Sequence, residues 1–415
     1  MEFDMLIKRT LLVTAMITAS YSQLSLAQEG SGFFNGSKLD LNLRTFYFNR
    51  DFIPNASADR VALAQGLRLN FQSGYINNIV GFDASVFAVG KLHGEDDKGK
   101  TGTLRTLSNG EQQGYAKFGQ AFFKVKLGEN SGVNVGRMTL STPLLDDSDS
   151  RTTPSSTQGV YAYTQYQNLN LYAIWSNKGS AKTSQEFRDY TDSNGSDYSI
   201  AIAGGNYKFN SGLDLSFAYG EADNVLSQTY ASVSYPIALT ERDQLNLNGT
   251  AYHGETDGDG AQGGVGSDYR SNLYSLSVQW VRDNKKLSLS YQAVNGDEYQ
   301  ESWDNFTNDD TGLYSSNSVQ VLDFDRAGER SLQARFDYQV PKVKGLSLMT
   351  RYIRGDNIKR SDGREGKEWE RDIEAKYAFQ SIKGLSLHLR NASVRSTEAT
   401  DLDENRLILN YSVAL

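Results

Sequence analysis

Basic residues recur at one parity within short stretches in which every second residue is apolar. In residues 37–49 the odd-numbered positions from 39 to 43 are leucines, so Arg44 belongs to the face opposite them. In residues 66–74 Arg68 is placed in the same way. Neighbouring side chains of a strand point to opposite faces, so the apolar and basic positions form separate surfaces. The residues that share this placement are Arg44, Arg68, Arg335, Arg351, Lys376, Arg390 and Arg406.

A row of guanidinium groups can pass an anion from site to site, provided that each site binds weakly enough to release it. We call these residues the basic wall and predict that they bind solute carboxylates. The chain has a net charge of −8, so the wall does not simply reflect overall composition. The alternative is a structural network in which acids of the same face neutralise the wall, and both arrangements could hold at different depths. These acids are Asp40, Asp337, Asp372 and Glu374.

The elements that must position these residues are strands. Eighteen stretches of the chain alternate apolar and polar residues, and the connections between them alternate short and long. This pattern predicts an all-β, 18-stranded antiparallel transmembrane β-barrel with tight turns at one rim and long loops at the other. The predicted strands begin near Ser37, Gly66, Ile79, Tyr115, Val133, Gly159, Leu169, Tyr198, Leu213, Leu226, Asp243, Ser271, Lys286, Arg330, Leu346, Trp369, Leu385 and Asn405.

Closure of the barrel determines which residues face the lumen. The last strand must pair with the first, so the strands that carry the basic wall are consecutive around the barrel. Arg or Lys facing lipid at mid-membrane costs about 2–4 kcal/mol, so we assign the apolar parity to lipid and the basic parity to the lumen. One strand does not fit, because Val133 and Val135 facing outward place Arg137 outward as well. Either Arg137 lies at the membrane interface or its strand is bulged.

The first residues predict export from the cytoplasm. Lys8 and Arg9 precede a mostly apolar run, and Ser25-Leu26-Ala27 resembles a small-residue cleavage site. We therefore expect a signal peptide at residues 1–27 and a single transmembrane barrel domain at residues 28–415. No later stretch offers the roughly 20 apolar residues of a membrane helix. The chain has no Cys, which excludes disulfides and thiolate chemistry.

Composition agrees with a barrel and argues against an enzyme. The 24 Tyr and 19 Phe suit interfacial aromatic girdles, and the 38 Gly suit turns and tight strand bends. His93 and His253 fall at loop starts, and His388 has the lumenal parity, so no His can serve a lipid-facing hydrolase. We expect no enzymatic activity, no cofactor, no metal and no nucleic-acid partner.

Several runs of the sequence resemble the OprD-type outer-membrane porins. The resemblance extends from the expected mature N-terminus to the C-terminus, and its first and fifth runs are the most specific. The runs are Leu43-Arg44-Thr45-Phe46-Tyr47-Phe48-Asn49-Arg50-Asp51-Phe52, Ala64-Gln65-Gly66, Phe71-Gln72-Ser73-Gly74, Ala327-Gly328-Glu329-Arg330-Ser331, Met349-Thr350-Arg351-Tyr352-Ile353-Arg354-Gly355-Asp356-Asn357 and Asp403-Glu404-Asn405-Arg406-Leu407.

The resemblance implies a channel whose third and seventh loops fold inward and narrow the pore, with an arginine ladder for small carboxylates. Carried over by position, the third-loop region is Thr139 to Gln158. A carboxylate facing the basic wall would create a transverse field that selects zwitterions. Alternatively, the third-loop acids are solvated or contact lipopolysaccharide through divalent ions. The implied constriction residues are Asp146, Asp147, Asp149, Arg151, Asp323 and Asp325.

The resulting hypothesis is a substrate-selective porin of the Gram-negative outer membrane. It would allow passive diffusion of small carboxylates such as amino acids and organic or aromatic acids, with outer-membrane lipid and lipopolysaccharide around a monomer or a loose trimer. The alternative among channels is an oligosaccharide porin similar to the chitoporins, since Phe46, Phe48 and Tyr252 face inward and could stack on sugars. An adhesin or receptor is a further alternative, although it would not need a basic lumen.

Overall fold

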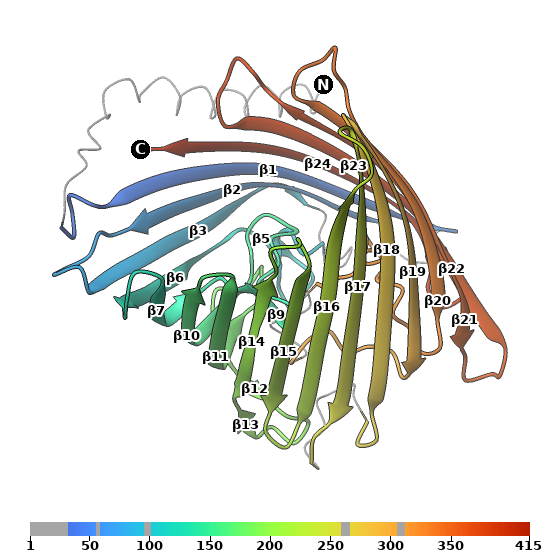
Figure 1. The fold of residues 1–415 in the computed structure, drawn as a ribbon, viewed down its shortest axis with the longest axis horizontal. Helices are drawn as coiled ribbons and strands as arrows, with labels where there is room; N and C mark the ends of the chain where they lie inside the picture. Colours follow the sequence, from blue (N-terminus) through green and yellow to red (C-terminus); the bar gives the residue numbers. More distant parts are fainter. Residues whose placement is uncertain (1–31, 55–58, 95–100, 259–265, 305–311) are drawn as a thin grey trace.

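The computed structural model describes residues 32–54, 59–94, 101–258, 266–304 and 312–415. In these residues eighteen antiparallel strands form a barrel that closes on itself, because the last strand pairs with the first (Figure 1). The expected signal peptide at residues 1–27 lies outside the described part of the chain. No helix in the described residues has the length and apolar character needed to cross a bilayer.

The barrel strands are β1 (Lys38–Ile53), β2 (Arg60–Gln72), β3 (Val80–Gly94), β6 (Tyr115–Lys126), β7 (Ser131–Met138), β10 (Ser156–Tyr166), β11 (Leu169–Ser180), β14 (Ile200–Lys208), β15 (Asp214–Ala222), β16 (Leu226–Ala238), β17 (Asp243–Thr256), β18 (Arg270–Arg282), β19 (Lys285–Gly296), β20 (Arg330–Gln339), β21 (Leu346–Lys359), β22 (Glu365–Ala378), β23 (Leu385–Ser396) and β24 (Asp401–Ala414). Short strands lie in the connections: β4 (Arg105–Thr106), β5 (Gln112–Gln113), β8 (Ser141–Thr142), β9 (Leu145–Asp146), β12 (Arg188–Thr191) and β13 (Asp197–Tyr198).

The predicted strand number is confirmed, and most strands begin within three residues of the expected position. The exceptions are β2, β22 and β24, which begin at Arg60, Glu365 and Asp401, four to six residues before the predicted starts. Each of these strands begins at the rim that carries the long loops. There the strands extend past the membrane, where both faces are polar and the alternation that marks a lipid-facing strand is lost.

The alternation of connection lengths is only partial, contrary to the expectation from sequence. The connections at 223–225 and 397–400 lie at the long-loop rim yet are no longer than most of the turns at the opposite rim. The second of these joins β23, which has 12 residues, to β24, which has 14. A strand needs only about 9–11 residues to cross a bilayer. The chain beyond the membrane is therefore paired strand here, and only a short turn is left to connect it.

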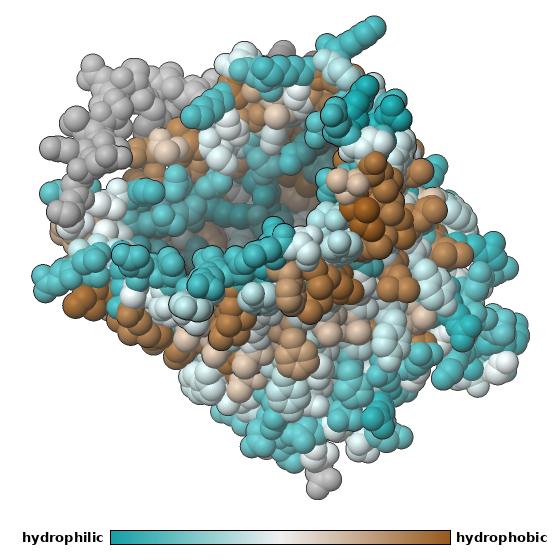
Figure 2. Space-filling model, in the orientation of Figure 1, coloured by the Kyte–Doolittle hydropathy of each residue, from teal (hydrophilic) through white to brown (hydrophobic). Residues whose placement is uncertain are grey.

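Apolar side chains cover the outer wall, whereas the inner wall carries polar side chains and, at residues such as Leu273 and Val294, part of a buried apolar cluster. Leu276, Leu289 and Leu332 lie on the outside and are 59–65% exposed. Their neighbours Ser277 and Ser290 point inward and are buried. Figure 2 shows the same division, with brown residues on the outer wall and a hollow lined by teal residues. The apolar parity therefore faces lipid, as predicted.

Arg137 is an outward-facing residue at the end of its strand. It is the next-to-last residue of β7, and Val135 on the same face is 45% exposed. The pairing of β7 with both neighbours runs without a shift in register, so the strand has no bulge. Of the two alternatives, the structure supports a position at the membrane interface. There the Arg137 Nε donates a hydrogen bond to the Gln158 Oε1 at 3.1 Å.

Two of the longer connections at the long-loop rim, which we call loop 3 and loop 7, fold into the barrel. Loop 3, residues 139–155, joins β7 to β10 and contains β8 and β9. Loop 7, residues 297–329, joins β19 to β20 and is described at 297–304 and 312–329. Both loops contact inward-facing side chains of the barrel wall, as detailed below. The two loops therefore occupy part of the lumen and determine its shape.

We expect Leu276→Arg to destabilise the barrel by about 2–4 kcal/mol, because this residue faces lipid at the middle of β18. Gln279→Arg, in the same strand but on the lumenal face, should cost much less. The free energy of unfolding from lipid vesicles, measured by denaturant titration, checks both variants. Equal losses for the two variants would contradict the assignment of faces.

Candidate functional site in the barrel lumen

The residues of the basic wall lie on consecutive strands. They occur on β20, β21, β22, β23, β24, β1 and β2, which pair in that order around the barrel. Within this ladder Arg335 lies directly opposite Arg351, and Arg390 lies directly opposite Arg406. Like charges placed opposite each other on neighbouring strands repel. Such an arrangement requires negative charge close by.

Acids of the same inward face supply that negative charge. The closest ion pairs join Arg335 to Asp337 at 2.7 Å, Arg351 to Asp372 at 2.6 Å, Arg390 to Glu374 at 2.9 Å and Arg406 to Glu404 at 2.5 Å. Three of these acids were among those weighed from the sequence as possible neutralising partners, and Glu404 was not. The basic wall is therefore a mixed network of cations and carboxylates.

Burial divides the wall into two kinds of cation. Arg351 and Arg406 are only 7% and 3% exposed, and the Arg406 Nη2 donates to the backbone oxygen of Gln320 in loop 7 at 3.0 Å. These two side chains form buried contacts within the protein and are shielded from a passing solute. Lys376, by contrast, is exposed, and no carboxylate within the described residues is in ion-pair contact with its amine.

Lys376 opens onto a cavity near the short-turn rim. The cavity has a volume of about 510 Å³, and its lining includes Arg335, Lys376 and His388. Asp337 and Glu374 also line it, and the His388 Nε2 lies 2.9 Å from the Glu374 Oε2. This part of the basic wall combines accessible cations with partial neutralisation. It can attract an anion without holding it tightly.

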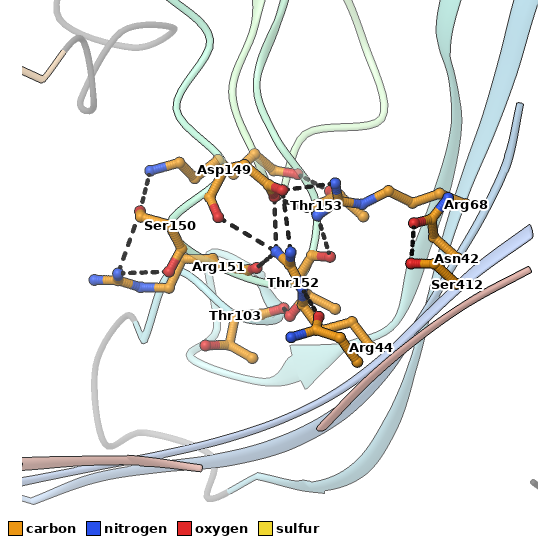
Figure 3. Close-up of polar contacts among 12 residues, drawn as sticks. Asn42, Arg44, Arg68, Thr103, Asp149, Ser150, Arg151, Thr152, Thr153 and Ser412 are labelled. Atoms are coloured by element: carbon orange, nitrogen blue, oxygen red, sulfur yellow. Dashed lines mark hydrogen bonds and ion pairs between the residues drawn. The ribbon is translucent and has the colours of Figure 1, made fainter. Parts of the chain in front are cut away.

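Loop 3 reaches the basic wall through Asp149. The Asp149 carboxylate accepts hydrogen bonds from both Arg44 and Arg68, with the Arg44 Nη1 at 2.7 Å and the Arg68 Nη1 at 2.8 Å (Figure 3). The same guanidinium groups donate to the backbone oxygens of Arg151 and Thr152. Both arginines therefore face the lumen, yet both are engaged by loop 3 rather than free.

The other predicted constriction residues of loop 3 have different positions. Asp147 is 8% exposed and its Oδ2 accepts a hydrogen bond from the Leu140 amide at 2.8 Å, so it stabilises the fold of the loop and does not line the lumen. Burial raises the pKa of the Asp147 carboxyl to about 6. Asp146 is half-buried beside the Tyr314 hydroxyl. The Arg151 side chain turns to the backbone oxygen of Thr101, away from Asp149.

The predicted loop 7 acids are also tied into their own loop. The Ser318 hydroxyl donates to the Asp323 carboxylate. Burial, reinforced by Asp323 and Glu298, raises the pKa of the Asp325 carboxyl well above its usual range. Asp147 therefore serves the fold of its own loop and not the constriction, because a loop folded back on itself uses such carboxylates to satisfy its own backbone donors.

Acids on the barrel wall hold loop 7 in place, and the sequence analysis did not identify this role. The Glu370 carboxylate accepts hydrogen bonds from the amides of Val321 and Leu322 at 3.0 and 2.8 Å. Arg326 of loop 7 forms an ion pair with Glu368 at 3.1 Å. The signal was present in the parity of β22, where Glu368 and Glu370 share the inward face with Lys376.

Loops 3 and 7 are joined by aromatic side chains. Trp303 of loop 7 is fully buried, and its indole N–H donates to the backbone oxygen of Leu144 in loop 3. The Tyr252 hydroxyl of the wall accepts from the Tyr314 amide at 2.8 Å and donates to the Pro143 oxygen at 3.5 Å. The two loops therefore form one packed body inside the barrel. A lone Trp in a long polar loop is the sequence signal for such an anchor.

The inward aromatics that suggested sugar stacking are not available to a solute. Phe46, Phe48 and Tyr252 are 0–2% exposed beneath the loops and their neighbours. Phe48 lies between guanidinium groups, with those of Arg50 and Arg151 at 5.5 and 5.3 Å from its ring centre. These rings contribute to packing and to cation–π contacts. They form no aromatic track along the lumen.

Comparisons with known proteins agree with this architecture. Residues 31–415 match the family model described as outer membrane porin, OprD family. Porin D of Pseudomonas aeruginosa is 30% identical over 97% of this chain and 98% of its own length. Among solved structures, OccK9 (OpdG) of P. aeruginosa has a TM-score of 0.84 at 28% identity, covering 93% of this chain and 100% of that one. OpdK of P. aeruginosa, crystallised with vanillate, has a TM-score of 0.81 at 28% identity, covering 92% and 100%.

Trp303→Phe should loosen loop 3, because it keeps a buried ring but leaves the Leu144 oxygen without its donor. An unpaired buried acceptor costs about 1–3 kcal/mol, so local opening and protease cleavage of loop 3 should rise at least about fivefold. Open-channel current noise should rise as well. Trp280→Phe is the matched control, since that indole donates to Asp243 at 3.0 Å on the barrel wall, outside both loops. Loop 3 cleavage that rises equally in the control would refute the coupling.

Glu329→Gln should reduce the loss of stability at high pH. Burial, with the nearby Glu368, raises the pKa of Glu329 from 4.5 to about 9. A carboxyl with a raised pKa stabilises the folded state at low pH, and this contribution is lost between about pH 4.5 and 9. Heat-induced unfolding in detergent should therefore shift less with pH in Glu329→Gln than in the wild type. Glu241→Gln, in an exposed turn, should behave as the wild type does.

Proposed function

We propose that this chain, which belongs to the OprD family of outer membrane porins, conducts small carboxylate-bearing solutes along the basic wall of its lumen. The protein is a β-barrel channel of the Gram-negative outer membrane through which small solutes diffuse, and it is not an enzyme. The solutes that fit best are amino acids and small organic or aromatic acids. In such barrels the short turns face the periplasm and the long loops face outward.

The observation that carries the proposal is the exposed Lys376, which lines the periplasmic cavity together with Arg335 and His388. An exposed ammonium group in a cavity that a guanidinium group also lines can bind an anion. The relative OpdK of P. aeruginosa was crystallised with vanillate, a small carboxylate. That observation concerns the relative, and it supports the same solute class for this chain.

Cations occur at three depths of the lumen. A cavity of about 590 Å³ near the long-loop rim is lined by Arg50, Arg60, Arg105, Arg151, Lys182 and Arg188. Arg44 and Arg68 lie deeper on β1 and β2, and Lys376 lies two residues from the periplasmic end of β22. Neighbouring acids weaken the attraction of each group of cations for an anion, which favours release of the anion to the next group. A carboxylate would thus meet attractive charge from entry to exit.

Oligosaccharide diffusion is the second candidate. A cavity of about 350 Å³ has an uncharged, hydroxyl-rich lining that includes Ser232, Thr250 and Ser275. Hydroxyl groups can bind sugars, and Tyr314 also lines this cavity, but Phe46, Phe48 and Tyr252, which would complete a stacking track, are buried. We therefore rank this candidate below carboxylate diffusion. Faster permeation of a neutral oligosaccharide than of benzoate would reverse the order.

Lys376→Glu should slow benzoate uptake into proteoliposomes, while Lys376→Arg should retain most of it. Exposed charge contacts are worth about 0.2–1 kcal/mol, so the loss should reach roughly fivefold and should shrink as salt is raised. Benzamide, which is neutral and similar in shape, should be unaffected.

The matched control is Lys367→Glu, on the same strand but the opposite face, which should change neither solute. Equal slowing of benzoate and benzamide by Lys376→Glu would show that the residue acts through pore shape. Unchanged benzoate uptake would remove the basic wall from the mechanism.

A further inference from the structure

Asp149 occupies the position that a solute carboxylate would take between Arg44 and Arg68. Its Oδ1 accepts from the Arg44 Nη1 at 2.7 Å and also from the Arg68 Nη2, and its Oδ2 accepts from the Arg44 Nη2 at 3.1 Å and the Arg68 Nη1 at 2.8 Å. Each oxygen is thus bound by both guanidinium groups, which is the geometry that arginine pairs offer to a carboxylate ligand. Figure 3 shows the carboxylate enclosed by the two side chains.

Loop 3 does not depend on Asp149 for its position. The Thr152 hydroxyl donates to the Thr103 oxygen at 3.2 Å, and the hydroxyls of Thr153 and Tyr115 lie 2.9 Å apart. The Lys182 amine donates to the Ser150 hydroxyl at 2.8 Å. These contacts hold Ser150, Thr152 and Thr153, which follow Asp149 in the chain (Figure 3). The Asp149 side chain can therefore rotate while the loop stays in place.

The two guanidinium groups also keep their orientation without Asp149. The Arg44 Nε donates to the Asn410 Oδ1 at 2.8 Å, and its Nη1 donates to the backbone oxygen of Arg151 at 2.6 Å. The Arg68 Nη2 donates to the backbone oxygen of Thr152 at 3.0 Å. The site is thus preorganised for a carboxylate, whether that carboxylate belongs to the chain or to a solute.

Charge and exposure allow an exchange. Two guanidinium groups face one carboxylate, so the cluster keeps a net positive charge that attracts a further anion. The Asp149 side chain is 43% exposed, and those of Arg44 and Arg68 are 20% and 15% exposed, so a solute can reach the pair. Burial acts to raise the pKa of Asp149, but the hydrogen bonds and charges of Arg68 and Arg44 hold it below its usual value. The resident group is therefore an ionised carboxylate.

We propose that the Asp149 carboxylate is a resident competitor that a solute carboxylate displaces from Arg44 and Arg68 during passage. The solute binds the guanidinium pair as Asp149 rotates toward the lumen, and Asp149 returns as the solute moves on. The guanidinium pair therefore has a carboxylate partner in either state, and the displaced Asp149 carboxylate is solvated by the water of the lumen. This inference rests on the proposed carboxylate function and assigns Asp149 a positioning role in it.

The test uses full-length protein in planar bilayers with benzoate as the probe. In Asp149→Asn the side chain keeps its shape and one oxygen but loses the charge that competes. We expect the benzoate concentration for half-maximal reduction of the ion current to fall on the order of tenfold, the scale of one charge-assisted contact. Asp149→Glu retains the charge and should stay within a few-fold of the wild type.

Asp189→Asn is the matched control. Asp189 is 42% exposed and forms an ion pair with Lys178 at 2.9 Å, so the change removes a comparable exposed carboxylate away from loop 3. Benzoate sensitivity should not change in this variant. Asp149→Asn and Asp189→Asn therefore differ in the site and not in the chemistry of the substitution.

The possible outcomes separate this inference from the function on which it rests. A larger or noisier open-channel current in Asp149→Asn, without a gain in benzoate sensitivity, would show that Asp149 is only a tether and would overturn the inference. Unchanged behaviour of Asp149→Asn would overturn it as well, while Lys376→Glu still slowed benzoate. If benzoate affected neither the wild type nor any variant, and Lys376→Glu had no effect, the proposed function itself would fail.

Discussion

Lipid offers no hydrogen-bond partner to a main chain, so every peptide group of a membrane-crossing strand has to be paired within the protein. The pairing of β1 with β24, from Asp40 opposite Ala414 to Ile53 opposite Asp401, meets this requirement at the last open edge. Closure then fixes the parity of every strand, because each strand has a lipid face and a lumenal face. The basic wall follows from that parity, because charged side chains on the other face of the strands would lie in lipid.

Charges gathered on one inner surface create a second requirement, which is compensation. Arg351 and Arg406 meet it through Asp372 and Glu404, and in doing so they become part of the wall that supports loop 7. Lys376 remains open to the lumen. One row of basic residues thus serves both stability and solute attraction, divided by burial rather than by residue type.

Strand number, face and the continuity of the basic wall could be predicted from the sequence, because strand periodicity is local information. The loops could not be predicted in the same way. The position of Asp147 depends on the Leu140 amide within a folded loop, and the charges of Asp323 and Glu298 act on Asp325 within loop 7. The Glu370 contact with loop 7 joins residues that lie 48 and 49 positions apart. Family resemblance gave the right loop for Asp149, but not its two arginine partners.

The bond between Trp303 and Leu144 joins segments 159 residues apart in the chain. Contacts between distant segments cost more loop-closure entropy than contacts between neighbouring strands, so we expect the packed body of loops 3 and 7 to assemble after most of the barrel. Insertion into the membrane and the gain of selectivity are then separate events in the life of the molecule. A newly closed barrel would then be a wide, unselective channel, and it would become selective once loops 3 and 7 have packed together.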